Sequence, residues 1–218
     1  MTTRAAMRGF RSGRLVFRLM AVAVLVLVSS AETHARSATA TTEPCPALKA
    51  RVDLSLSPLL IISDGPIPAP KNMQQEPTPA QLKCMEALKA AGKRAIERKK
   101  IAEGVTRYLA AVNAVPSVAE TTYQDLASML DRSAYRQPAL AAYFKAWKAF
   151  EVNYNRPDAK LDSIAVLVLA DIRDSIVRLG GQVPPPSSEV GRIVIGNSTR
   201  HLREQYFNAE PVVAPSKP

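Results

Sequence analysis

Residues 78–113 read TPAQLKCMEALKAAGKRAIERKKIAEGVTRYLAAVN and carry the strongest helix signals of the chain. Thr78 can cap a helix and Gln81 completes a capping box with it, while the proline between them suits the first helical position. Apolar residues then recur at helical spacing, but the apolar face changes side between Gly92 and Gly104. We therefore expect a helix that runs to the end of this stretch and either bends or breaks midway, or whose two halves pack on different neighbours.

Three more amphipathic segments follow. Ser117 and Glu120 form a second capping box, and the helix that they open should end before Pro138, where a third helix begins. A fourth opens near Pro157 and stops at Gly180. The pattern predicts a mainly α fold, an antiparallel cluster of about four helices joined by short loops. We expect its main core to consist of Leu140, Phe144, Trp147, Leu161, Ile164, Val168 and Ile172.

Two shorter segments have strand character. Apolar and polar residues alternate from Val52, a short apolar run follows at residues 59–62, and residues 190–195 are again mostly apolar. We expect these segments to form a small two-stranded β element. The prolines of residues 66–79 fix φ and bar their predecessors from the helical region, so this stretch should be an extended tether.

The first 35 residues have the pattern of an export signal. Five arginines and an unbroken apolar run of ten residues, 19–28, precede small residues. Ten residues at about 1.5 Å each span about half of a ~30 Å hydrocarbon core, which favours a cleaved signal over a membrane anchor. We expect cleavage after Ala35, with Ala31 and Ala40 as alternatives, and a periplasmic or extracellular protein without a transmembrane span.

The chain then divides into five parts. They are a removed signal peptide (1–35), an extended Pro-rich segment with short strands (36–77), a helical core domain (78–181), a linker with a short strand and a short helix (182–208) and a disordered tail (209–218). Removing the signal lowers the formal net charge from +10 to +6. Two cysteines remain, Cys45 and Cys84, and an exported chain with an even number most simply pairs them in a disulfide.

A basic run in the first long helix is the surface feature that stands out. Its members are Lys93, Arg94, Arg98, Lys99 and Lys100. Clustered cations attract anionic lipids and polysaccharides, and no aromatic residues are interleaved to stack on bases, so nucleic acid is disfavoured. The leading prediction is a non-enzymatic protein that binds a protein or an anionic component of the cell envelope. A solvated helix face, partly neutralised by Glu97 and Glu103, explains the same run.

Two other functions stay open. The aromatic stripe Tyr143, Trp147, Phe150 and Tyr154 could line a pocket and make the protein a carrier of a small apolar ligand, although core packing is the commoner use. An enzyme would use His201, or the acidic pairs Asp158 with Asp162 and Asp171 with Asp174. These spacings are also common on solvated helices. The sequence contains no recognisable motif for a metal or a cofactor, and we expect neither.

Overall fold

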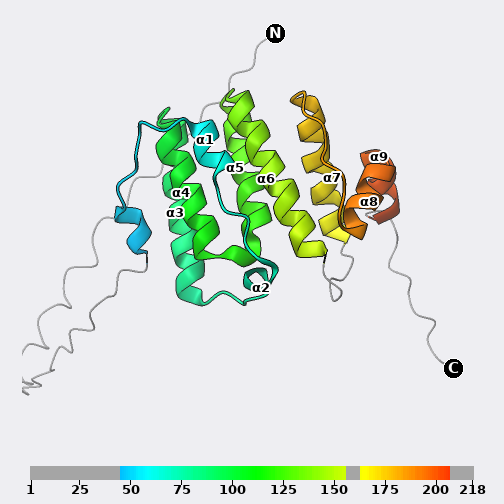
Figure 1. Ribbon diagram of the computed structural model, residues 1–218, viewed down its shortest axis with the longest axis horizontal. Coiled ribbons are helices and arrows are strands. Elements are labelled where there is room, and N and C mark those ends of the chain that lie inside the picture. The colour runs from blue at the N-terminus through cyan, green and yellow to red at the C-terminus, as the bar shows by residue number, and fades with distance from the viewer. Residues whose placement is uncertain (1–44, 156–162, 207–218) are drawn as a thin grey trace, which may run out of the picture. The chain divides into compact units, whose positions relative to one another are not determined.

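The computed structural model describes residues 45–155 and 163–206, and helices make up most of this part of the chain (Figure 1). The predicted signal at 1–35, the tail at 209–218, and Asp158, Leu161 and Asp162 lie outside the described residues. In chain order the elements are the 3₁₀ turn η1 (Pro46–Lys49), α1 (Pro58–Ser63), α2 (Pro70–Met73), α3 (Pro79–Glu97), α4 (Ile101–Ala114), the 3₁₀ turn η2 (Pro116–Val118), α5 (Ala119–Arg132), α6 (Arg136–Tyr154), α7 (Ser163–Arg178), α8 (Glu189–Gly196) and α9 (Thr199–Tyr206).

The predicted first helix is broken into α3 and α4. Its capping box is present, because Gln81 N donates to Thr78 Oγ1 over 3.3 Å and Thr78 N donates to Gln81 Oε1 over 2.8 Å. The two helices fold back on each other where Gly92 faces Gly104, and a Cβ atom on Gly104 would lie 2.9 Å from the Gly92 carbonyl oxygen. The change of apolar face therefore marks a helix hairpin whose backbones approach too closely for any larger residue.

The next pair, α5 and α6, also runs antiparallel. Asn153 donates to Glu120 over 3.2 Å near one end, and the hydroxyls of Ser128 and Tyr143 lie 3.4 Å apart nearer the other. The predicted second capping box does not form, because residues 116–118 make a 3₁₀ turn and α5 starts only at Ala119. Glu120 thus serves as a link to α6 rather than as part of a cap.

The proline-rich segment is packed against the helices. Its helix α1 contacts α4 and α6. Two side chains fasten the loop after it, since Lys145 Nζ donates to the Gly65 carbonyl over 2.5 Å and the Tyr123 hydroxyl to the Pro66 carbonyl over 2.7 Å. Ile62 is fully buried. The expectation of an extended tether and of a strand at 59–62 was therefore wrong: a proline at the first helical position starts a short helix here.

The second predicted strand, residues 190–195, is helix α8. Ser188 caps it by accepting from Gly191 N over 3.0 Å, and the buried carboxylate of Glu151 on α6 accepts from the Ser188 hydroxyl and backbone amide, each over 2.7 Å. Arg173 of α7 donates to the Asn197 carbonyl at the end of α8 over 2.5 Å. A short apolar run of this kind does not distinguish a strand from a helix, and these caps decide for the helix.

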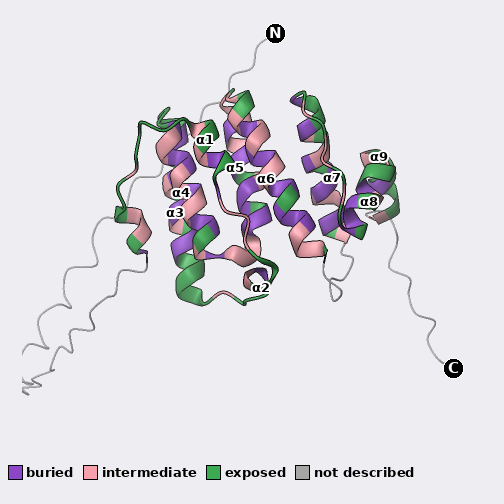
Figure 2. Ribbon diagram, in the orientation of Figure 1, coloured by how far each residue is buried: buried purple, intermediate pink, exposed green. Residues whose placement is uncertain are grey.

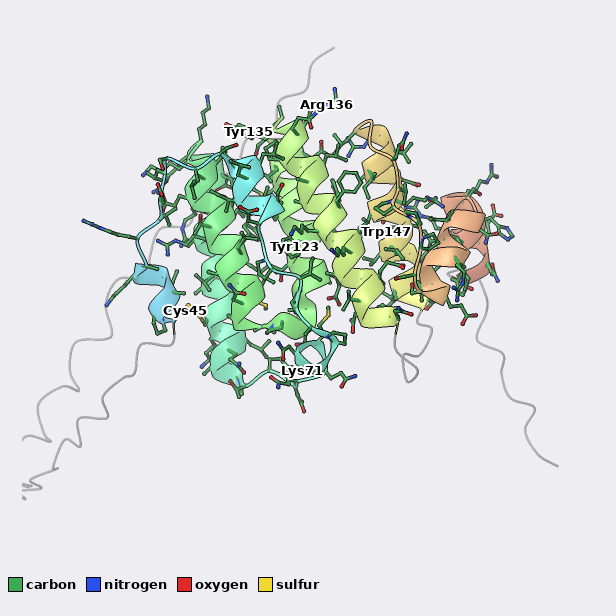
Figure 3. All side chains as sticks on the ribbon, in the orientation of Figure 1. Cys45, Lys71, Tyr123, Tyr135, Arg136 and Trp147 are labelled. Atoms are coloured by element: carbon green, nitrogen blue, oxygen red, sulfur yellow. A yellow bond between two sulfur atoms is a disulfide. The ribbon has the colours of Figure 1, made fainter. Side chains whose placement is uncertain are left out.

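The core lies along α5, α6 and α7, with buried faces turned towards one another (Figure 2). Trp147 is 1% exposed and Ile172 is fully buried, as predicted (Figure 3). Leu140, Phe144 and Val168 are half-buried at its edge. Ile164 is 68% exposed, which contradicts the prediction. The buried face of α7 instead carries Ala165, Val166, Leu169, Ala170, Ile172 and Ile176.

Candidate functional site

The basic run occupies the end of α3 and the turn to α4. At this turn Lys100 N donates to the Ala95 carbonyl and Lys99 N to the Ile96 carbonyl, each over 2.9 Å, which is the hydrogen-bond pattern of a Schellman motif. Lys99 has φ of 62°, in the left-handed region that glycine usually fills. The motif ends α3 and exposes the lysine at the tip of the hairpin.

All five predicted basic residues are exposed, and they lie on both sides of α3. Arg94, Arg98 and Lys100 line a shallow cleft of about 150 Å³ together with Glu103. Within the described part of the chain, the one ion pair of this group is that of Lys100 with Glu103, at 4.0 Å. The run therefore presents largely uncompensated positive charge to solvent.

Lys93 faces a second and larger cleft, of about 340 Å³, which α3, α4 and α5 form together. Its lining residues are Glu86, Lys89, Ala90, Lys93, Tyr108, Asp125, Met129 and Arg132. Lys89 lies 2.7 Å from Asp125 and 3.7 Å from Glu86, so one lysine bridges two carboxylates. The cleft combines this group, which has one positive and two negative charges, with the two further cations Lys93 and Arg132.

Tyr108 of α4 also lines this larger cleft. Its residue is 3% exposed, and burial raises its pKa to about 12, an effect to which the carboxylate of Asp125 adds. The ring is seated against Gly92, because a Cβ atom there would lie 2.7 Å from Tyr108 Cδ2. A neutral phenol is therefore held in place as a hydrogen-bond donor at neutral pH.

The sequence indicated Lys93 but not the rest of this cleft. Tyr108 belongs to the apolar pattern of its helix, and Asp125 and Arg132 belong to another helix than the basic run. A tyrosine on an otherwise apolar helical face, such as Tyr108, is a signal in the sequence for a site of this kind, because its hydroxyl needs a hydrogen-bond partner. The sequence alone does not predict that α3, α4 and α5 meet to form this cleft.

The aromatic stripe predicted as an alternative ligand site lies in the core. Tyr143, Trp147 and Phe150 are each at most 5% exposed. Phe150 stacks on the half-buried Tyr154, with ring centroids 4.7 Å apart. The stripe packs against α5 and α7, and the two clefts described above are both on α3. This arrangement is what core packing predicts.

The acidic pair Asp171 and Asp174 makes contacts with helix α9. Asp171 lies 3.1 Å from Arg203, and Asp174 lies 2.7 Å from its neighbour Arg173 and also accepts from Thr199. The side chain of His201 is exposed, and the nearby Glu204 pairs instead with Arg200 at 3.1 Å. The described residues hold no group of three or more His, Cys, Asp or Glu that could bind a metal ion. These carboxylates fasten α9 to α7.

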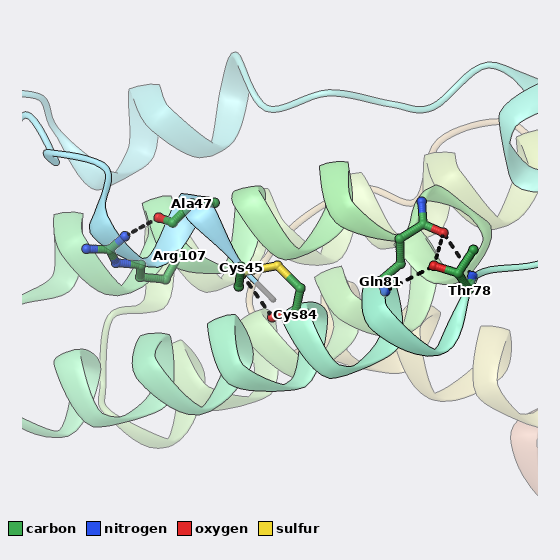
Figure 4. The surroundings of a disulfide bond; sticks show 6 residues. All are labelled: Cys45, Ala47, Thr78, Gln81, Cys84 and Arg107. Atoms are coloured by element: carbon green, nitrogen blue, oxygen red, sulfur yellow. Dashed lines mark hydrogen bonds between the residues drawn. A yellow bond between two sulfur atoms is a disulfide. The ribbon is translucent and has the colours of Figure 1, made fainter. Parts of the chain in front are cut away.

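The two cysteines join the start of the described chain to α3 (Figure 4). Their sulfur atoms are 2.03 Å apart, the distance of a disulfide bond, in agreement with the predicted pair Cys45 and Cys84. Arg107 of α4 donates to the Ala47 carbonyl over 2.6 Å beside it. A second small cluster of buried residues, including Leu88 and Val115, surrounds this link.

No helix among residues 45–155 and 163–206 has the length and apolar character needed to cross a bilayer. No known protein family, curated protein or solved structure matches this chain. Function must therefore be argued from the site itself.

Proposed function

We propose that the protein is exported and acts by binding an anionic component of the cell envelope, or an acidic surface of a protein, through the basic turn between α3 and α4. The observation that carries this proposal is the exposure of five cations around one helix end, of which Lys100 alone has an acidic partner among the described residues. Such a surface concentrates anions by long-range attraction and by release of their counterions.

The conformation of Lys99 adds support. A residue with a Cβ atom in the left-handed region costs about 1 to 2 kcal/mol, which glycine would avoid. Placing a lysine there raises the charge at the hairpin tip and costs stability. It is this added charge at the exposed tip, and not the strain itself, that supports a binding role.

Export is supported by two independent features. The first is the arginine-rich start and apolar run of residues 1–35, and the second is the pairing of Cys45 with Cys84 at bonding distance, which is compatible with an oxidising compartment. Intact mass spectrometry of the secreted protein tests this part. We expect a chain that begins at Arg36 and does not react with an alkylating reagent before reduction; retention of residues 19–28 would contradict it.

The binding role is tested with dextran sulfate and with phosphatidylglycerol vesicles over a salt series. Affinity should fall steeply as salt rises, and the double substitution Lys99→Gln/Lys100→Gln should weaken binding about tenfold or more, since each lysine near an anionic surface contributes about 1 kcal/mol. The matched control is Lys71→Gln/Lys83→Gln, which removes the same charge from exposed positions outside the turn. Equal binding by the two double variants, or binding that does not depend on salt, would refute the proposal.

A further inference from the structure

The larger cleft beside the basic turn has two chemically different ends. At one end Lys89 bridges Glu86 and Asp125, so that this end carries one more negative than positive charge. At the other end are Lys93, one helical turn after Lys89 on α3, and Arg132, two turns after Asp125 on α5. Neither of these cations has an acidic partner among the described residues. Positive charge is therefore concentrated at the end that faces the turn.

Arg132 is oriented by its own helix. Its Nε donates to the Ser128 carbonyl over 3.2 Å, and its Nη2 lies 3.5 Å from Met129 Sδ. Nη1 makes no hydrogen bond to any described residue. The guanidinium is thus held along α5 with donor hydrogens left for a ligand in the cleft.

Tyr108 supplies a third donor from α4. The tyrosine is almost completely buried, and its hydroxyl has no hydrogen-bond partner in the described part of the chain. The hydroxyl oxygen does not belong to the fully buried atoms without a partner in the described residues, so it is accessible at the surface of the cleft. Because Gly92 fixes the ring, the hydroxyl is directed into the cleft that Lys93 and Arg132 line.

We propose that Lys93, Tyr108 and Arg132 form a binding site for a phosphate group, carried by the anionic partner of the basic turn. This inference rests on the proposed anion-binding function and names the chemical group that is recognised. Donors from three helices line one cleft, which suits the several oxygens of a tetrahedral phosphate, whereas a planar carboxylate is satisfied by one arginine fork. Lipid headgroups and soluble compounds both carry this group, and the recognition chemistry is the same for the two sources.

The test measures binding of glycerol 1-phosphate by calorimetry, and of phosphatidylglycerol vesicles by sedimentation. We expect Arg132→Gln and Lys93→Gln each to weaken binding of the phosphate about tenfold, because a hydrogen bond to a charged group contributes about 1.5 to 3 kcal/mol. Tyr108→Phe keeps the ring and its packing, and should weaken binding about threefold, the effect of losing a neutral hydrogen bond. Lys83→Gln on the exposed face of α3 is the control and should change nothing.

The outcomes separate this inference from the proposed function. Cleft-dependent binding of glycerol 1-phosphate identifies a soluble source, and cleft-dependent binding of vesicles alone identifies a lipid headgroup; either supports the site. If Arg132→Gln and Tyr108→Phe bind both probes like the parent while Lys99→Gln/Lys100→Gln does not, the phosphate site is refuted and the basic turn stands. If acetate competes as well as inorganic phosphate, the assignment to phosphate is refuted.

Discussion

The turns between α3 and α4 and between α5 and α6 have the same backbone and different surroundings. Each ends its helix in a Schellman motif, with the closing bond from Lys100 N to Ala95 O or from Tyr135 N to Leu130 O, both 2.9 Å long. Each also places a residue other than glycine in the left-handed region, Lys99 with φ of 62° and Ala134 with φ of 65°. Backbone strain alone therefore does not distinguish a binding surface from a simple connection.

The difference lies in how the charges are used. At the α5–α6 turn Asp131 forms an ion pair with Arg178 of α7, so this carboxylate joins neighbouring helices, while Arg132 beside it lines the larger cleft on α3. At the α3–α4 turn Lys100 approaches Glu103 only to 4.0 Å, and the other cations of the basic run face solvent. The two turns thus share one geometry but differ in charge, since the α3–α4 turn gathers several exposed cations and the α5–α6 turn has an acidic residue that pairs with α7.

The largest expected effect concerns the disulfide between Cys45 and Cys84. Of the helix hairpins in the described part of the chain, only the α3–α4 hairpin has such a covalent link. Replacing Cys45 and Cys84 with serine opens a loop with a sequence separation of 39, which should lower the free energy of unfolding by about 4 kcal/mol. Denaturant unfolding measures the loss, and hydrogen exchange should show it first in α3. Equal loss of protection in α5 and α6 would break the comparison, because it would make the two hairpins one cooperative unit.

The next effect tests the close contact of the α3–α4 hairpin. Gly104→Ala places a Cβ atom 2.5 Å from Ile96 Cγ1 and 2.9 Å from the Gly92 carbonyl, and should destabilise by about 1 to 3 kcal/mol. Gly196→Ala is the control, since a Cβ atom there meets nothing within 4 Å. Thermal unfolding of the two variants compares them. Equal stability would mean that the helices separate at no cost.

The third effect concerns pH and the buried phenol between the hairpins. The pKa of Tyr108 is raised from 10.0 to about 12, so between these values the unfolded chain loses the proton while the folded chain keeps it. Stability should therefore fall as pH rises through this window, by about 1 to 2 kcal/mol from this group. Tyr108→Phe should be less sensitive over the same range in denaturant unfolding. An identical pH profile for parent and variant would contradict the burial of the hydroxyl.

The smallest stability effect separates strain from function. Lys99→Gly and Ala134→Gly should each stabilise by about 0.5 to 1 kcal/mol, because glycine adopts the left-handed conformation without a Cβ clash. Only Lys99→Gly should also weaken binding to anionic vesicles. If both variants bind the vesicles like the parent, Lys99 destabilises the protein without contributing to binding, and the two turns do not differ in function.

Local signals in the sequence predicted local structure well. The box of Thr78 and Gln81 and the break between Gly92 and Gly104 follow from capping and helical periodicity, and they are present. The segments near Leu60 and Ile193 were misjudged because short apolar runs suit strands and helices equally. The helix near Ile193 also depends on a distant residue, since Glu151 of α6 holds its capping residue Ser188.

The site was predictable only in part, for a similar reason. Exposure of the basic run follows from the charge of its five side chains, but the cleft depends on how three helices meet. Ile164 shows the same limit within one helix, since its spacing placed it on the apolar face and the packing of α7 turned it outward. The spacing of apolar residues predicts which face of a helix is apolar. The neighbouring helices determine which residues at the borders of that face are buried.

The hydrogen bonds from Ser187 and Ser188 to Glu151 limit how far the chain can be shortened at its C-terminal end. This carboxylate is 5% exposed and is satisfied by donors from Ser187 and Ser188. A protein truncated before residue 187 would lose all of these donors and, with them, the buried core residues Val190, Val194 and Leu202 of α8 and α9. The two short helices at the end of the described chain are therefore required by the core, and any minimal version of the protein for biochemical work must extend through them.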